Sequence, residues 1–348
     1  MDKIKVIIWG FGAMGRGMAQ MLLMKKGVEI VGICDLNPSI VGRNFLEVLE
    51  VEVDHPKVFI SDQIDLLLNH QKADVVLLCT DSFVKGAFEK IKKVVTHKIN
   101  VISTAEEMAY PMASEPQLAK QIDNLAKAFG VTVLGTGINP GFIMDLLVVA
   151  LTGTMVDVKH IEAKRINSLS PFGPTVMHEQ GVGITLDEYH HRVAEGDLAG
   201  HVGFKESVHM ISDALGVKLD GFKQQMEPII TTIDRKSPYG EAEAGHLAGI
   251  NMTGQGLMNG DVFINMIHPQ QIEPESEGTK TGDYINLKGT PNIHMAITPE
   301  INGGIGTIAM CVNMIPHVLN AKPGLKTMID LPVPRAILGD MRDLLDHE

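Results

Sequence analysis

The chain has 348 residues, of which 45% are apolar and 21% charged, values ordinary for a soluble globular protein with room for two domains. Its formal net charge of -12 argues against nucleic-acid binding, because nucleic-acid binders usually present a basic face. Three scattered cysteines form neither a disulfide framework nor a zinc spacing, and no apolar run reaches the roughly 18 residues of a membrane helix. We therefore expect a cytoplasmic protein without a metal site.

The first expected element is a short apolar strand at residues 5–9, followed by a glycine-rich turn and a helix that runs to residue 23. Gly10, Gly12 and Gly15 have the spacing G-x-G-x-x-G. In a dinucleotide-binding fold these glycines allow a tight turn, close approach of a pyrophosphate, and packing of the helix on the strand. The start of the helix would add N–H groups and a guanidinium, so further cofactor candidates are Ala13, Met14 and Arg16.

A second strand within 28–35 ends at Asp35, about 20 residues beyond the glycines, where an acidic residue accepts from the ribose 2′-hydroxyl. This position favours NAD, with NADP possible. No basic residue follows until Arg43, so a 2′-phosphate would meet a bare carboxylate. The alternative for Asp35 is a turn role, because the sequence DLNP is typical of turns.

Three further strands, at 74–79, 98–103 and 130–136, alternate with helices at 82–95 and 114–130. This βαβα order predicts an α/β fold with a doubly wound parallel sheet of the Rossmann type. Ligands bind at the carboxyl ends of such strands. The polar residues there are candidates for the cofactor (Thr80, Asp81, Ser82) and for the substrate or nicotinamide (Thr136, Asn139), although turn roles explain the second group nearly as well.

Two adjacent carboxylates, Glu106 and Glu107, follow the strand at 98–103. Most glutamates are solvated surface charges, and both could be that. A carboxylate at the mouth of a strand, on the cofactor side, could instead serve as a base if partial burial raises its pKa.

After Pro140 the pattern changes to an α+β type. We expect strands within 159–173 and 222–233, helices within 185–200 and 204–216, and three successive antiparallel strands within 258–271, 280–289 and 292–300. The predicted domains are a dinucleotide-binding domain at 1–140, a substrate and dimerisation domain at 141–310, and a C-terminal helix and tail at 311–348 that packs back on the first domain. The open antiparallel face suggests a homodimer.

The chain resembles the 2,4-diaminopentanoate dehydrogenases, a family related to dihydrodipicolinate reductases that also contains amine dehydrogenases. The resemblance covers nearly the whole chain and rests on WGFGAMGRG, STAEEMAYP, GTGINPGF, GHVGFKES and the long segment PEINGGIGTIAMCVNMIPHVLNAKPGLKTMIDLP. It implies reversible oxidative deamination with a nicotinamide cofactor, in which the 4-amino group of 2,4-diaminopentanoate leaves as ammonia during ornithine breakdown. The family's catalytic glutamate lies in the segment matching STAEE; the match favours Glu107, with Glu106 as the fallback.

A substrate of this kind carries a carboxylate. Arg165 and Asn167 alternate along an expected strand, so both could face one cleft, where the arginine would bind the carboxylate in a bidentate manner. A surface ion pair explains Arg165 equally well. His268 is a further pocket candidate, although a single histidine after an apolar strand is more often structural.

Two other functions are compatible with the sequence. Dihydrodipicolinate reductases carry a paired-histidine segment followed by a lysine. This chain has the pair, His190 and His191, but Arg192 follows in place of the lysine. An imine reductase is therefore the second candidate. A non-catalytic dinucleotide-binding redox sensor is the third. Such a sensor would usually append a basic DNA-binding module, which this acidic sequence does not show.

Overall fold

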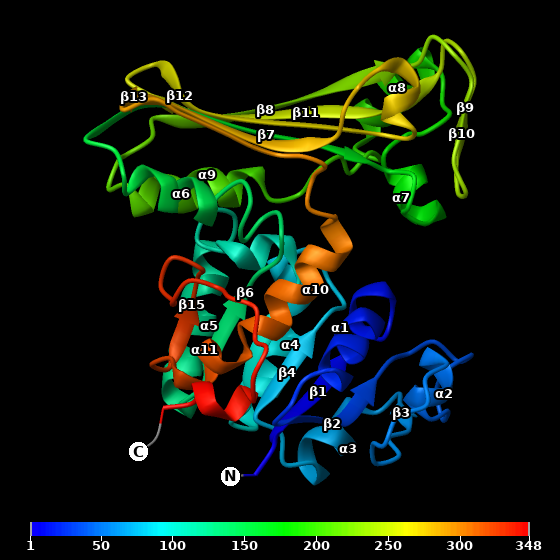
Figure 1. Cartoon of the computed structure of the whole chain (residues 1–348), viewed down its shortest axis with the longest axis vertical. Coiled ribbons are helices and arrows are strands. Elements are labelled where there is room, and N and C mark those ends of the chain that lie inside the picture. The colour runs from blue at the N-terminus through cyan, green and yellow to red at the C-terminus, as the bar shows by residue number, and fades with distance from the viewer. Residues whose placement is uncertain (1, 347–348) are drawn as a thin grey trace. The chain divides into compact units, whose positions relative to one another are not determined.

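The structure, a computed structural model, describes residues 2–346. The chain forms two compact units (Figure 1). The first unit contains the chain up to Phe142 together with the chain from Gly303 onward, and the second unit is Ile143–Asn302. The second unit is therefore an insertion in the sequence of the first.

The first unit is built on a seven-stranded parallel sheet of order β15-β6-β5-β4-β1-β2-β3. In this order β1 lies between β2 and β4, which is the arrangement of a doubly wound dinucleotide-binding sheet. The predicted fold class is thereby confirmed. The strands are β1 (Ile4–Trp9), β2 (Val28–Cys34), β3 (Ile60–Ser61), β4 (Val75–Leu78), β5 (Asn100–Ser103), β6 (Thr132–Gly135) and β15 (Gly324–Lys326).

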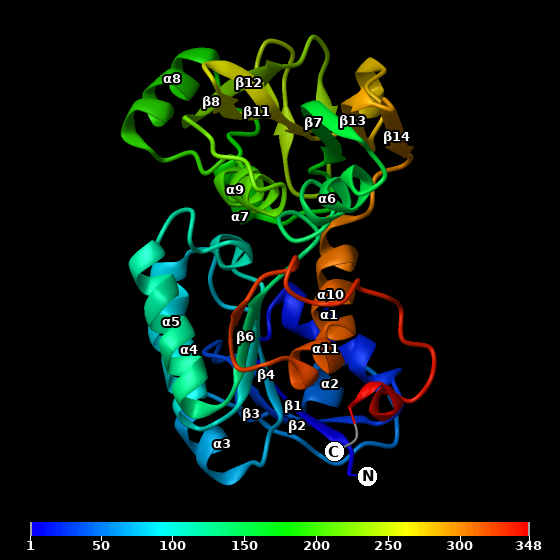
Figure 2. The same ribbon diagram turned by 90° about the vertical axis from the view of Figure 1, so that its left-hand side faces the viewer.

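Helices cover both faces of this sheet (Figures 1 and 2). One face carries α3 (Ile64–His70), α4 (Val84–Thr96) and α5 (Pro116–Phe129), and the other carries α1 (Ala13–Leu23), α10 (Gly303–Asn313) and α11 (Ile315–Asn320). The short helix α2 (Phe45–Leu49) lies between β2 and β3 in the chain. Strands covered on both faces are apolar throughout, and all four residues of β4 are buried.

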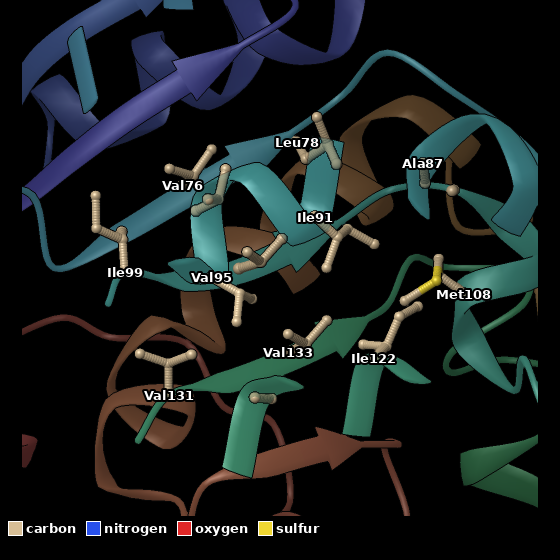
Figure 3. Close-up of a cluster of buried hydrophobic side chains, with 14 of the residues drawn as sticks. Val76, Leu78, Ala87, Ile91, Val95, Ile99, Met108, Ile122, Val131 and Val133 are labelled. Atoms are coloured by element: carbon tan, nitrogen blue, oxygen red, sulfur yellow. The ribbon is translucent and has the colours of Figure 1, made fainter. Parts of the chain in front are cut away.

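The core between the sheet and α4 and α5 fixes the helices next to the strand ends (Figure 3). Helix α4 places Ala87, Ile91 and Val95 on one face, at the spacing of a 3.6-residue repeat. These side chains pack with Ile122 of α5 and Val133 of β6. Through this packing, the N-terminus of α4 is held at the carboxyl end of β4.

The C-terminal segment returns to the first unit, as predicted, and α10 packs on α1. A Cβ atom at Gly17 of α1 would lie 2.1 Å from Cδ1 of Ile308 in α10. The two helices therefore approach closely here, and a larger residue at this position would require the Ile308 side chain to move. The last strand, β15, then adds to β6 at the edge of the parallel sheet.

The second unit contains a mixed six-stranded sheet of order β14-β13-β7-β12-β11-β8. Helices α6 (Leu146–Thr152) and α9 (Phe204–Ala214) lie along one face of the sheet, and α7 (Pro174–Glu179) and α8 (Leu186–Glu195) precede α9 in the chain (Figure 1). The strands are β7 (Asp157–Ser168), β8 (Gly221–Ile230), β11 (Leu247–Met258), β12 (Asp261–Gln271), β13 (Gly282–Thr290) and β14 (Ile293–Ile297), with a small separate pair β9 (Arg235–Lys236) and β10 (Glu241–Ala242).

The predicted run of three successive antiparallel strands is correct for β13 and β14, which pair antiparallel. It is wrong for β12 and β13, because β7 lies between them and runs parallel to β12. Strand β11, which the sequence did not indicate, contains Gly249, Gly254 and Gly256, and glycines weaken a strand pattern. The glycines make room for α9: a Cβ atom at Gly254 would lie 2.8 Å from the Phe204 ring, and one at Gly256 would lie 2.8 Å from Val208. Tertiary packing therefore determines this strand.

Candidate active site

A pocket of about 420 Å³ opens at the carboxyl ends of β1, β2 and β4 in the first unit. It is lined by the predicted residues Gly10, Gly12, Asp35 and Thr80 and also by Trp9, Cys34, Leu36, Asp62, Ile64, Cys79 and Lys90. The glycine turn, the acidic residue after β2 and the polar residue after β4 are thus brought together in one place.

The glycine turn has the geometry of a phosphate cradle. Gly10 has φ +97°, and a Cβ atom there would lie 2.8 Å from the Cys79 carbonyl oxygen, so the turn requires glycine. A Cβ atom at Gly15 would lie 1.9 Å from the Gly10 oxygen, which fits a glycine that allows helix and strand to pack. No atom lies within 4 Å of a Cβ position at Gly12, so this part of the backbone is open to a ligand.

The start of α1 has free capacity to hold an anion. Gly12 is its N-cap, and no side chain caps the helix, so the backbone N–H groups at Ala13 and Met14 begin an uncapped first turn. Arg16 donates from Nε to the Phe11 carbonyl (3.1 Å), and its guanidinium lies 5.9 Å from the centre of the Phe11 ring. The arginine is therefore held beside the turn. These groups fit a dinucleotide pyrophosphate.

Asp35 has the turn role considered from the sequence, and its place in the pocket leaves the ribose role a prediction. Its Oδ2 accepts from the Phe11 N–H (2.5 Å) and its Oδ1 accepts from the Asn37 N–H (2.8 Å), so the carboxylate stabilises the two turns around it. It also lines the pocket together with Asp62. Two carboxylates in the lining favour ribose hydroxyls, which can donate hydrogen bonds to them, over a 2′-phosphate, which their negative charge would repel.

The end of β4 carries a polar network that includes a residue the sequence did not indicate. Asp81 accepts from the Thr80 hydroxyl (2.5 Å) and from the Lys90 ammonium (2.7 Å). Lys90 belongs to α4, and its long side chain reaches back toward the start of that helix, the direction in which helical side chains point. The only sequence signal for Lys90 is its place on the helix after β4. Ser82 contributes its carbonyl, which accepts from the Glu107 N–H (3.1 Å).

The two glutamates lie on a short 3-10 helix, η1 (Glu106–Ala109), directly after β5, and both are half-buried. The Glu107 carboxylate accepts from the Val84 N–H at the start of α4 (2.8 Å). The N-cap residue of α4 makes no capping hydrogen bond with its side chain. Glu107, which comes much later in the chain, acts as the cap instead. The Glu107 carboxylate therefore joins η1 to the β4–α4 turn.

The loop after β6 is compact and leaves a buried hydroxyl without a partner. Thr136 is 2% exposed, and its Oγ1 makes no hydrogen bond within residues 2–346. The loop also contains the predicted Asn139, and Thr307 of α10 holds it by accepting from the Ile138 N–H (3.1 Å). Buried polar atoms are normally hydrogen-bonded, so Thr136 is a group that a ligand could satisfy.

In the second unit, Arg165 of β7 is engaged in a buried ion pair. Arg165 donates to the Asp283 carboxylate of β13 (2.5 Å) and to the Ile301 carbonyl, and Asp283 also accepts from the Ile301 N–H (2.9 Å). Both side chains of the pair are 2% exposed. Burial raises the pKa of Asp283, and the Arg165 charge opposes that rise. The structure thus favours the ion-pair interpretation of Arg165, in the interior and not at the surface.

Asn167 and His268 lie side by side in the same unit, with Asn167 Oδ1 2.9 Å from His268 Nε2. The His268 ring packs edge-on against the His201 ring, with 4.7 Å between centroids. Burial, followed by the influence of His201 and Arg165, lowers the pKa of His268 well below its ordinary value. His268 is therefore neutral near pH 7, and its Nδ1 is buried without a hydrogen-bond partner in the described chain.

The paired histidines that suggested the reductase alternative are exposed, unlike the buried His268. His190 and His191 are both exposed on α8, and His191 Nδ1 lies 3.2 Å from the Glu195 carboxylate on the same helix. This arrangement is typical of a solvated helix face.

Two family profiles together cover most of the chain. Residues 142–347 match the 2,4-diaminopentanoate dehydrogenase C-terminal domain, and residues 4–130 match the dihydrodipicolinate reductase N-terminus. A curated 2,4-diaminopentanoate dehydrogenase from Acetoanaerobium sticklandii is 59% identical over 349 residues, spanning 100% of this chain and 99% of that protein. The chain belongs to the 2,4-diaminopentanoate dehydrogenase family. It is an amine dehydrogenase, and its first unit is the NAD(P)-binding domain.

More distant relatives agree with this family assignment. An amine dehydrogenase from Streptomyces virginiae is 24% identical and spans 96% of this chain and 98% of its own length. The solved amine dehydrogenase from Mycobacterium smegmatis shares the fold, with a TM-score of 0.86 at 24% identity over 97% of this chain and 98% of that chain. A dipicolinate-bound dihydrodipicolinate reductase from a Paenisporosarcina species has a TM-score of only 0.50 at 13% identity, over 93% of this chain and 97% of that chain.

Among residues 2–346 there is no group of three or more His, Cys, Asp or Glu side chains arranged to hold a metal ion. Within the same residues, no helix of the enzyme is long and apolar enough to cross a membrane.

Proposed function

We propose that the enzyme catalyses the reversible, NAD(P)-dependent oxidative deamination of 2,4-diaminopentanoate to 2-amino-4-oxopentanoate and ammonia. The observation that carries the proposal is the 59% identity, along the whole chain, to the curated dehydrogenase of that name. The site geometry agrees with it, since a dinucleotide cradle and a pair of carboxylates follow strands β1 and β5 of one parallel sheet.

The chemistry requires a base. A nicotinamide cofactor held at the glycine turn would supply the acceptor for a hydride from the amine carbon. The nitrogen must first lose a proton, because an ammonium has no lone pair to donate. A half-buried carboxylate can take that proton and release it to solvent, and the restored anion can then stabilise the positive charge of the iminium and accept a proton from the attacking water.

We assign the role of base to Glu106 and a positioning role to Glu107. The sequence favoured Glu107, with Glu106 as the fallback. The Glu107 carboxylate accepts the Val84 N–H at the start of α4, so it is committed to capping that helix. Glu106 precedes it on η1 and is half-buried.

The other contacts are proposed unit by unit. In the first unit, the cofactor is held by the glycine turn, Arg16, Asp35 and the residues after β4, and the Thr136 hydroxyl and Asn139 contact the substrate or nicotinamide. In the second unit, His268 with Asn167 is the proposed polar group for the substrate. Arg165 is proposed to support that region through its ion pair with Asp283 and not to bind the substrate carboxylate.

The preferred cofactor, the metabolic context and the oligomeric state are also part of the proposal. We propose NAD as the main cofactor, because Asp35 and Asp62 line the pocket where a 2′-phosphate would lie. The proposed context is ornithine breakdown in the cytoplasm, by a homodimer that acts on a small amine and has no nucleic-acid partner.

The test is a spectrophotometric assay of cofactor reduction with 2,4-diaminopentanoate and NAD, repeated with NADP. The substitution Glu106→Gln is expected to lower kcat by roughly 10²–10⁴-fold, the usual contribution of a general base. The matched control is Glu107→Gln, whose amide oxygen can still accept the Val84 N–H, and which should keep most of the activity. Loss of activity in the control alone would transfer the role of base to Glu107. Absence of amine-dependent reduction with either cofactor would contradict the proposed reaction.

A further inference from the structure

A second pocket of about 420 Å³ lies in the first unit, on α11 and the chain that follows it. It shares no lining residue with the dinucleotide pocket. Its walls come from α11, β15 and the C-terminal segment, which is orange to red in Figure 1. Nothing in the proposed reaction uses this pocket.

Positive charge in this pocket has no ion-pair partner within the described chain. Three cationic side chains line it, Lys322, Lys326 and Arg335, and none of them makes an ion pair or a side-chain hydrogen bond within residues 2–346. The lining also includes two carboxylates, Asp330 and Asp346. Asp330 is committed elsewhere, because its Oδ2 accepts from both the N–H and the hydroxyl of Thr327, each at 2.8 Å.

His317 adds a buried polar group to the same pocket. It is 7% exposed, and its ring makes no hydrogen bond within the described chain. Burial, and then the nearby Arg335 charge, lowers its pKa, so the ring is neutral near pH 7 and has an N–H to donate. Because His317 lines the pocket, a bound acceptor could receive this N–H.

The walls of the pocket are held in place without a ligand. The Asn320 side chain donates from Nδ2 to the Leu344 carbonyl (2.8 Å), and its Oδ1 accepts from the Asp346 N–H (3.0 Å). The side chain thus fixes the C-terminal segment to α11. On the other side, β15 is paired with β6 of the parallel sheet. A pre-formed pocket avoids much of the ordering cost of binding.

We propose that this pocket is a second ligand site, which binds a small polyanion that carries carboxylate or phosphate groups. Arg335 and Lys326 grip the anion, Lys322 adds charge at the rim, and His317 donates a hydrogen bond from below. The volume lies within the range of about 300–1,000 Å³ that is usual for small-molecule sites.

The proposal is tested by isothermal titration of the full-length enzyme with inorganic phosphate and, separately, with citrate, at constant ionic strength. Saturating NAD is present throughout, so that the glycine turn cannot take up phosphate. We expect binding of at least one anion, and the preferred one identifies the source as a phosphate or a polycarboxylate. Arg335→Gln and Lys326→Gln should each weaken that binding about tenfold or more, the worth of one charge-assisted hydrogen bond.

The matched control is Lys218→Gln, which removes an exposed and unpaired lysine of the second unit and should leave binding unchanged. Far-UV circular dichroism and NAD affinity check that each variant is folded. Absence of binding by both anions, or equal binding in the Arg335→Gln/Lys326→Gln double variant, would overturn the proposal. The readout is independent of amine oxidation, so failure here leaves the proposed reaction standing.

Discussion

The two units use buried polar groups in different ways. In the first unit, the polar side chains lie at strand ends and bind nearby backbone, as Asp35 does at Phe11 and Glu107 at Val84. In the second unit, Arg165 is paired with a side chain 118 residues away across neighbouring strands. Side chains of the first kind complete turns and helix caps. A buried ion pair of the second kind needs both of its charges, because either charge alone would be buried without a counter-ion. The difference predicts how each unit responds to mutation.

The largest effect on stability is expected from breaking the buried pair in the second unit. Arg165→Ala leaves the Asp283 carboxylate buried without its counter-ion and should cost about 3–5 kcal/mol in the free energy of unfolding, measured by urea denaturation. The double variant Arg165→Met/Asp283→Leu removes both charges and should recover much of that loss. A single variant that loses less than about 1 kcal/mol would show that water reaches the pair and would remove the contrast between the units.

The first unit should show a comparable sensitivity only in its apolar core. Ile91 is 1% exposed and lies where α4 packs on the sheet (Figure 3), so Ile91→Ala should cost about 2–5 kcal/mol. The control Lys92→Ala changes the next, exposed position of the same helix and should be almost neutral. Similar losses from both substitutions would contradict the view that packing of Ile91 stabilises α4.

The buried histidine of the second unit predicts a dependence of stability on pH. Because the pKa of His268 is lowered in the folded state, the unfolded chain binds the proton more readily below about pH 6.5. Stability is thus fully present above that pH and falls as the pH drops, by up to about 1.4 kcal/mol per pH unit for one such group. Urea denaturation between pH 7 and pH 5 measures the slope, and His268→Gln should reduce it. An unchanged slope in this variant would assign the effect to other groups.

The smallest effect is expected from the helix cap in the first unit. Glu107→Ala leaves the Val84 N–H without its acceptor and should cost about 1 kcal/mol, seen as a lower Tm. Glu107→Gln keeps an acceptor and should lose less. If both variants lost the same stability, the charge of the carboxylate and not its hydrogen bond would be what stabilises α4.

Features of the first unit that adjacent residues create could be predicted from the sequence, and features that depend on residues far apart in the chain could not. The parallel sheet, the glycine turn and the polar strand ends of the first unit were predictable, because adjacent residues in the chain create them. The contact of Glu107 with the start of α4 was not, because its partner Val84 lies 23 residues earlier. Lys90 was missed for the same reason, since its partners Thr80 and Asp81 are brought to it by the fold of the β4–α4 turn.

The second unit could be predicted as a set of elements but not as a sheet. Helices α8 and α9 and five of its six long strands were indicated, whereas the position of β7 between β12 and β13 depends on pairings across more than a hundred residues. The Asn-Gly turn at residues 259–260, with both residues at positive φ, is the local signal that could have revealed β11 as the hairpin partner of β12. The role of Arg165 depends on the same distant pairings.

The insertion of the second unit has a consequence for synthesis on the ribosome. When Phe142 has emerged, the parallel sheet still lacks its edge strand β15, and α1 lacks the helix that covers Gly17. These parts are translated only after the whole of residues 143–302. The nascent dinucleotide-binding domain therefore remains incomplete while the inserted unit is translated, with the edge of its sheet and helix α1 exposed. The domain translated first is thus the last to be completed, and it is a natural client for chaperones during that interval.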